Sequence, residues 1–283
     1  MTIFITLIIL LGYVFSRATG DATYGGVWVA IIISLGMTAI SYFQGDKIAL
    51  WTSGAKPIAK EDNPYLYRMV ENLCITNGTP VPKIYIINDP AINAFATGRK
   101  PELASVAVTT GAIEKLANEE LEGVLAHELS HVKNYDIRFM TLVAVMVGAI
   151  SILANIFLRS RFMFGGRRSD DRGGGGQIAA VFMIVGIVLA ILSPIIAELI
   201  KLAISRRREY LADASGSLLT RYPEGLAKAL EKIAAENMPM RQASAATAHL
   251  FFANPFSKKS LSKIFSTHPP IEERIKKLRE MGT

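Results

Sequence analysis

Residues 127 to 131 read HELSH, a pattern with two histidines four positions apart and a glutamate directly after the first. On an α-helix these histidines lie on the same face one turn apart, so His127 and His131 could bind one zinc ion together. Glu128 could hold a water molecule at the metal and accept its proton as a general base. The alternative is that the two histidines only make a helix surface polar. The spacing favours the centre of a zinc hydrolase site.

A hydrolytic zinc site needs a third protein ligand and one position left open for water. The segment SRRREYLAD at 205–213 places Glu209 and Asp213 four positions apart on an expected helix. We predict that Glu209 binds the metal and that Asp213 supports a ligand imidazole through a hydrogen bond. The same acids could instead pair with the three arginines at 206–208 on a solvated helix surface. Because Glu209 follows one apolar run and His131 precedes another, a membrane hairpin would return the chain to the surface that carries the histidines.

The composition indicates a membrane protein. Of the 283 residues, 51% are hydrophobic and 19% are charged, and the mean hydropathy is +0.31. These values are too apolar for a typical soluble domain or a disordered chain. The net charge of +7 comes without a basic stripe interleaved with aromatic residues, which favours an anionic membrane surface over nucleic acid as the partner. Cys74 is the only cysteine, so an intramolecular disulfide and a multi-cysteine metal site are excluded.

Four apolar runs predict the membrane segments. They are Thr2–Phe15, Val27–Phe43, Phe139–Leu158 and Ile178–Ala197. We predict a transmembrane hairpin at 1–43 and a second hairpin, transmembrane or membrane-associated, at 139–200 with a glycine-rich loop. Lysines and arginines border the soluble segments, which predicts that these segments face the cytoplasm. The loop at 159–177 also carries five arginines, so either it departs from this rule or the second hairpin does not cross fully.

Two soluble regions, 44–138 and 201–283, complete the expected organisation. In the first, short β-branched runs between turn residues predict a small sheet. The expected elements are a helix at Pro64–Asn77, strands at Lys83–Ile87 and Ser105–Thr109, and an extended segment at Ala91–Thr97. A further helix is expected to have Asn118 as its N-cap and to continue unbroken to Leu158. The second region is expected to hold helices through Asp213, at Pro223–Glu236 and after Pro270.

Five segments spread over most of the chain share a pattern with a known family. They are NAFATG at 93–98, VAVTTG at 106–111, HELSH, REYLAD at 208–213 and THPPIEERI at 267–275. In these segments the sequence resembles the HtpX family of membrane proteases, which are related to the Ste24-type CAAX proteases. The resemblance implies a gluzincin-type protease with one Zn²⁺ per chain, held by His127, His131 and Glu209, and with Glu128 as the base. It implies a mostly α integral membrane protein with a zincin-like metalloprotease domain containing a small β-sheet.

The resemblance also implies a location and a substrate class. It predicts a multi-pass protein of the cytoplasmic membrane whose active site faces the cytoplasm and cleaves misfolded or misassembled membrane proteins as quality control under stress. In related zincins a segment like Asn93-Ala94-Phe95 forms an edge strand that pairs with the substrate backbone. The alternative is an ordinary strand that packs Phe95 inward. His268, Arg206 and Tyr210 are candidates for the donor that stabilises the oxyanion.

Two other functions stay open from the sequence. A processing protease that acts on prenylated or other defined peptides would cut at one site rather than at many. A membrane binding module with structural zinc would have a closed site of four protein ligands, and no activity would depend on Glu128. The sequence predicts no oligomeric state.

Overall fold

The computed structural model describes residues 2–19, 23–143, 145–146, 148, 206–236, 238–243, 247–256 and 269–281. The chain forms two compact units, the first from residues 1–43 and 146–199 and the second from residues 44–145 and 200–283. The predicted glycine-rich loop and most of the predicted hairpin at 139–200 lie outside the described residues, as does His268.

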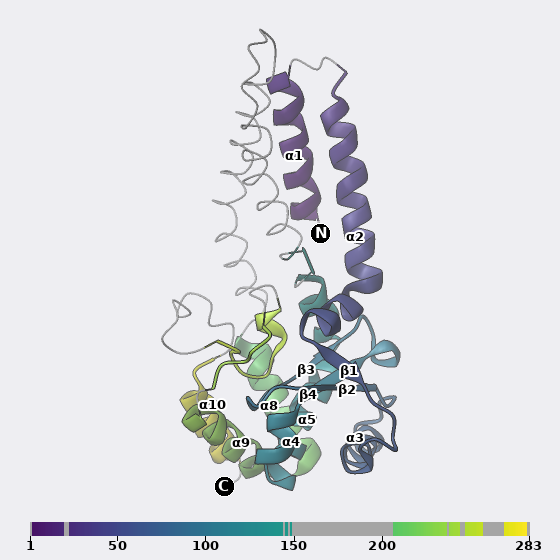
Figure 1. Ribbon diagram of the computed structural model, residues 1–283. Helices are drawn as coiled ribbons and strands as arrows, with labels where there is room; N and C mark the ends of the chain where they lie inside the picture. The colour runs from purple at the N-terminus through teal and green to yellow at the C-terminus, as the bar shows by residue number, and fades with distance from the viewer. Residues whose placement is uncertain are drawn as a thin grey trace. The chain divides into compact units, whose positions relative to one another are not determined.

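Two helices form the described part of the first unit, α1 at Thr2–Thr19 and α2, which begins in this unit and spans Gly25–Thr52. They lie side by side (Figure 1), and Gly26 donates its backbone N–H to the Ser16 hydroxyl over 3.0 Å. Gly12 permits this close packing, because a Cβ at that position would lie 2.5 Å from the Gly26 carbonyl oxygen. The described residues of 1–43 therefore form a pair of packed helices, and their crossing of a membrane stays a prediction.

Helix α2 is the one helix among the described residues that is long and apolar enough to cross a membrane. Its 28 residues extend about 42 Å, which exceeds a hydrocarbon core of about 30 Å. Large apolar side chains stand exposed on it, among them Trp28 at 65% and Ile32 at 69%. Such a surface is costly in water and stable among lipids. The helix also continues past Phe43, where the sequence predicted the end of the apolar segment.

The second unit contains a four-stranded mixed sheet in the order β1-β2-β4-β3. Its strands are β1 at Ala55–Pro57, β2 at Lys83–Ile87, β3 at Ala94–Thr97 and β4 at Ser105–Thr109. Strands β2 and β4 run parallel, whereas β1 and β3 are antiparallel to their neighbours. The strands predicted at 83–87 and 105–109 are confirmed, and the extended segment becomes a strand only from Ala94. Because β3 pairs with β4 alone, it forms one edge of the sheet.

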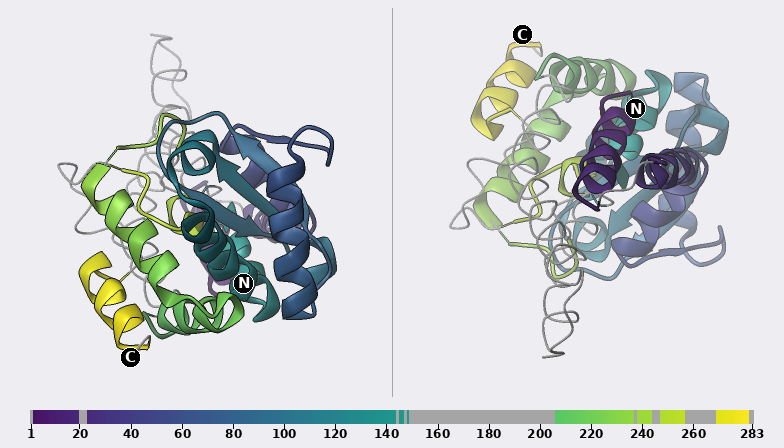
Figure 2. Two further views of the ribbon diagram at one scale, coloured as in Figure 1. Left: turned by 90° about the horizontal axis from the view of Figure 1, so that it is seen from below. Right: turned by 90° about the horizontal axis from the view of Figure 1, so that it is seen from above.

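Helix α5, at Asn118–Lys133, packs against β3 and against three other helices of this unit, α3, α8 and α9. The remaining helical elements are α3 at Pro64–Asn77, α4 at Thr110–Lys115, α8 at Arg206–Thr220, α9 at Pro223–Glu236, α10 at Ile271–Met281, and the 3₁₀ turns η1 at Pro101–Leu103 and η2 at Ala248–Leu250. Leu121, Leu125 and Leu129 lie one turn apart on α5 and join Leu226 of α9 in the main core. Burying each leucine contributes roughly 1.5–3 kcal/mol, so this core fixes α5 in place. Figure 2 shows α9 and α10 side by side.

The start of α5 differs by one residue from the expected position. The N-cap is Ala117, and Asn118 is the first helical residue. Glu120 supplies the capping contact, because its carboxylate accepts the Ala117 backbone N–H over 2.7 Å. The Asn118 side chain instead accepts a hydrogen bond from the Tyr65 hydroxyl. A glutamate at the third helical position has therefore replaced the expected asparagine cap.

The prediction of one unbroken helix to Leu158 is wrong. Helix α5 ends at Lys133, and Tyr135 takes a left-handed backbone conformation with φ of 61°. Helical turns resume at residue 136. No proline or glycine lies at this break. The change of direction brings Asp136 into contact with His131 near the end of α5.

Candidate metal centre and active site

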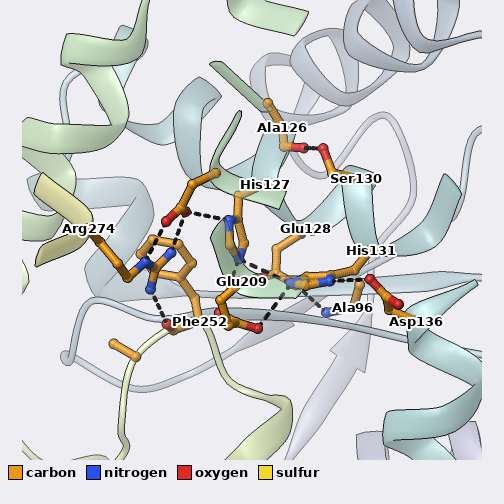
Figure 3. A network of polar contacts seen from close by, with 12 residues as sticks. Ala96, Ala126, His127, Glu128, Ser130, His131, Asp136, Glu209, Phe252 and Arg274 are labelled. Atoms are coloured by element: carbon orange, nitrogen blue, oxygen red, sulfur yellow. Dashed lines mark hydrogen bonds and ion pairs between the residues drawn. The ribbon is translucent and has the colours of Figure 1, made fainter. Parts of the chain in front are cut away.

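The three predicted metal ligands lie together on buried faces of α5 and α8 (Figure 3). The Nε2 atoms of His127 and His131 are 3.2 Å apart. The carboxylate of Glu209 places one oxygen 3.8 Å from Nε2 of His127 and the other 3.5 Å from Nε2 of His131. All three side chains are buried, with exposures of 4% or less. The structure thus brings together three side chains that come from two separate helices.

This spacing fits a zinc ion. Four zinc ligands at about 2.0–2.1 Å in a tetrahedron lie about 3.3 Å from one another, close to the distances between these donor atoms. Two imidazoles and one carboxylate form a donor set that hydrolytic zinc sites use. Four buried carboxylates surround the two histidines, those of Glu128, Asp136, Glu209 and Asp213, whereas Arg274 is the buried arginine of the site. A divalent cation would offset part of this excess of negative charge.

Helix α8 can deliver Glu209 to the histidines because it packs directly on α5. Gly216 lies at the closest approach, since a Cβ there would sit 2.9 Å from the backbone nitrogen of His127. One turn after Glu209, Asp213 places Oδ1 2.9 Å from Nδ1 of His127. This contact turns the ring so that Nε2 faces Glu209. Asp213 therefore lies where the sequence predicted a support for a ligand imidazole.

A second acid supports the other histidine, and the sequence analysis missed it. Asp136 places Oδ2 3.1 Å from Nδ1 of His131. The other oxygen of Asp136 lies 3.4 Å from a guanidinium nitrogen of Arg208. Five residues along an unbroken helix would point away from His131, so only the turn at Tyr135 makes this contact possible. In the sequence, the signal for that turn is Asn134, the C-cap residue of α5, because asparagine is common just after the end of a helix.

His127 and His131 have shifted pKa values, and the two shifts go in opposite directions. Burial lowers the pKa of His127 to about 4, although its contact with Asp213 opposes this effect. Burial also acts to lower the pKa of His131, but the hydrogen bond to Asp136 and the charge of Glu209 outweigh it and raise the pKa to about 9. At neutral pH and without a metal ion, His131 is therefore charged. Metal binding at its Nε2 requires the release of that proton.

The candidate base is joined to the edge strand. Glu128 is 2% exposed, and its Oε2 accepts the backbone N–H of Ala96 in β3 over 2.8 Å. This hydrogen bond fixes the orientation of the carboxylate next to the candidate ligands (Figure 3). Strand β3 thus positions the group that the sequence predicts to move the proton.

Residues 60–282 match the family model described as Peptidase family M48. The chain belongs to peptidase family M48. A "Protease HtpX homolog" from Dictyoglomus turgidum is 49% identical over 257 residues, which cover 91% of this chain and 82% of the relative. Another from Caldanaerobacter subterraneus subsp. tengcongensis is 45% identical over 99% of this chain and 93% of the relative. The resemblance to HtpX proteases is confirmed, and this M48 chain is a metalloprotease, a hydrolase.

A solved structure shares the fold of this M48 chain. The crystal structure of S. mikatae Ste24p aligns with a TM-score of 0.56 at 19% sequence identity and covers 95% of this chain. The chain spans 62% of the length of that protein. The predicted class of a mostly helical protein with a metalloprotease domain around a small sheet is confirmed at this level, and α2 is the one described helix able to cross a membrane.

The segment predicted to bind substrate contacts the protein itself in this structure. The Asn93 side chain donates to the Ala253 carbonyl over 2.9 Å and accepts the Ala253 N–H over 3.1 Å. The Ala94 carbonyl accepts the N–H of Phe252 over 2.8 Å. Phe95 is buried, as the alternative interpretation expected. Residues 252–253 therefore lie against the outer edge of β3, where a substrate strand was expected.

The structure does not bring the described oxyanion candidates to the metal ligands. The Tyr210 hydroxyl donates to Glu273 of α10 over 2.7 Å, and Lys277 lies over the Tyr210 ring. Arg206 is exposed at the first described turn of α8. These contacts occupy Tyr210 at the protein surface, away from the paired imidazoles. The third candidate, His268, lies outside the described residues.

Proposed function

We propose that the chain is a zinc-dependent endopeptidase in which His127, His131 and Glu209 hold the metal and Glu128 is the general base. The observation that supports this most directly is the spacing of 3.2–3.8 Å between the donor atoms of the three buried side chains. A bound zinc ion would polarise the scissile carbonyl and make a water molecule more acidic. Glu128 takes the proton from the attacking water and returns it to the leaving amine. Asp213 holds the His127 imidazole in one orientation through the cycle.

The substrate proposal follows from the position of β3. We propose that a polypeptide adds to the outer edge of this strand, where it replaces the backbone contacts of Phe252 and Ala253. Recognition through backbone hydrogen bonds depends little on side chains, so we expect broad specificity. The hydrogen bond from the Ala96 N–H to Glu128 would keep this general base beside a peptide that pairs with β3.

The substrates that we propose are misfolded or misassembled membrane proteins. The exposed apolar surface of α2 supports an anchor in the cytoplasmic membrane, and the basic residues that border the soluble segments support an active site on the cytoplasmic side. The names of the relatives in the HtpX group support protease activity but name no substrate.

Metal dependence of cleavage tests the proposed function. Detergent-purified protein is expected to cut a reduced and alkylated soluble protein at many sites, to lose this activity on chelation, and to regain it with one equivalent of zinc. Mass spectrometry of the products gives the number of sites. Cleavage that survives complete removal of metal would overturn the proposal, and a single cut in several unrelated substrates would favour a processing protease.

Hydrogen exchange tests the substrate position on β3. In the Glu128→Gln variant, which we expect to bind a peptide without cutting it, an added unfolded peptide is expected to speed exchange of the Phe252 and Ala253 amides. The reason is that a substrate strand displaces this segment from the two acceptors that now protect its amides, the Ala94 carbonyl of β3 and the Asn93 side-chain oxygen beside it. Amides in the middle of α9 serve as the internal control and should not change. Peptide binding with unchanged protection at Phe252 and Ala253 would show that the substrate lies elsewhere.

A further inference from the structure

Arg274, on helix α10, is a charged side chain with almost no access to water, since it is only 1% exposed. Burying a guanidinium is costly unless it is paired and hydrogen-bonded. The contacts of Arg274 therefore show which group compensates this cost. Arg274 belongs to the segment THPPIEERI, in which the sequence analysis assigned it no role.

The guanidinium meets the carboxylate of Asp213 at two points. Its Nε donates to Oδ2 over 2.9 Å, and its Nη2 donates to Oδ1 over 2.7 Å. The plane also lies over the ring of Phe252, with 4.7 Å from the guanidinium carbon to the ring centroid. Two parallel hydrogen bonds and one stacked face leave the carboxylate a single orientation.

The same carboxylate then contacts a candidate metal ligand. Oδ1 of Asp213, which accepts from Arg274, lies 2.9 Å from Nδ1 of His127. The Phe252 ring packs edge-on against His127, with 5.0 Å between the centroids. Arg274, Asp213 and His127 therefore form one continuous chain of buried contacts. Figure 3 shows Arg274 and His127 at the two ends of this chain.

We propose that Arg274 is a positioning residue for the metal centre, which holds Asp213 so that His127 presents Nε2 to the metal. This inference rests on the proposed zinc site. Outer partners of metal-binding imidazoles set ring orientation and ligand strength, and their loss costs about 10- to 100-fold in metal affinity. Helix α10 thus contributes to the site through the contact between Arg274 and Asp213.

Two other arginine–carboxylate pairs can be compared with Arg274 and Asp213. Arg208 supports Asp136 behind the other histidine, but its side chain is 42% exposed and meets the carboxylate at 3.4 Å. Arg279, also on α10, makes a two-point contact with Glu224 at the surface. Solvent weakens both of these pairs, whereas the buried contact of Arg274 is shielded from it. Arg279 is therefore a matched control on the same helix.

The deciding variant is Arg274→Lys, which keeps the charge and the apolar stem but replaces the two-point contact with one point. We expect its zinc affinity, measured by competition with a chelator, to fall about 10- to 100-fold. The visible spectrum of the cobalt-substituted protein should shift, and kcat should fall with KM nearly unchanged. Arg279→Lys should match the wild type in all three. Circular dichroism and the unfolding temperature report whether each variant is folded.

Two further variants, Asp213→Asn and Asp213→Asn/Arg274→Met, cover the case in which Arg274→Lys does not fold. The first keeps an amide oxygen that can accept from the guanidinium, and the second removes both charges together. If Arg274 acts through Asp213, the second change should add little to the loss of zinc affinity caused by the first. A further loss of about 10-fold or more in the double variant, or a folded Arg274→Lys with wild-type zinc affinity and cobalt spectrum, would overturn the inference. A wild-type protein that binds no zinc would instead overturn the proposed function.

Discussion

Replacing Glu128 with glutamine is expected to lower kcat/KM for peptide cleavage about 100- to 10,000-fold, the share that general acid–base catalysis supplies. Glutamine keeps the size of the side chain, and its amide oxygen can still accept the Ala96 N–H. What disappears is the group that can take a proton from water. The variant should therefore still hold one zinc per chain. Cleavage of a reduced and alkylated protein and metal content by mass spectrometry measure the two properties together.

The control for this variant is Glu119→Gln, which changes an exposed glutamate in the first turn of the same helix. It should cut at the wild-type rate. A Glu128→Gln protein that cuts normally would show that Glu128 is not the base. If neither the wild type nor the variant cuts and both hold one zinc tightly, the site is structural, as in the alternative of a binding module.

Replacing Glu209 with glutamine should give the opposite pattern, because this change removes a proposed ligand rather than the base. We expect zinc affinity to fall by more than the roughly 10- to 100-fold that loss of an outer partner costs. The neutral amide is a weaker donor than a carboxylate, and it leaves His127 and His131 as the two strong ligands. Activity should be lost at low zinc and should return in part as zinc is raised. Chelator competition followed by a zinc titration of activity gives both quantities.

Glu272→Gln, an exposed change on α10, is the control for the Glu209 variant and should bind zinc as the wild type does. Together, Glu128→Gln and Glu209→Gln distinguish the role of general base from the role of metal ligand. Retained zinc without cleavage identifies the base, and lost zinc identifies the ligand. A Glu209→Gln protein with wild-type zinc affinity would mean that the third ligand comes from another residue.

The sequence was most informative where a local pattern determines the outcome. The spacing of His127 and His131 follows from helical geometry alone, and the positions of β2 and β4 follow from short β-branched runs between turns. The pair Glu209 and Asp213 could be placed on one helix face for the same reason. Joining the two helices at one site depended on the expected membrane hairpin and on the resemblance to a family, because the spacing along the chain does not state which helices will pack.

The parts that could not be predicted depend on contacts between distant segments. Asp136 reaches His131 only because Tyr135 takes a left-handed conformation that its residue type does not favour. No pattern in the sequence marks Arg274 as buried, and only its packing against Phe252 and Asp213 shows that it is. Asn93 was assigned to the substrate, but its hydrogen bonds to Ala253 depend on where a remote segment folds back.

The contacts from His127 through Asp213 to Arg274 can form only late in the synthesis of the protein, because Arg274 lies near the C-terminal end of this sequence. Synthesis proceeds from the N-terminus, so Arg274 is added roughly 7 to 30 s after His127 at ordinary rates of translation. During that interval Asp213 lacks its buried partner, and the ring of His127 is not yet held. The proposed zinc site therefore gains its full support only after helix α10 has been synthesised and has packed against Asp213.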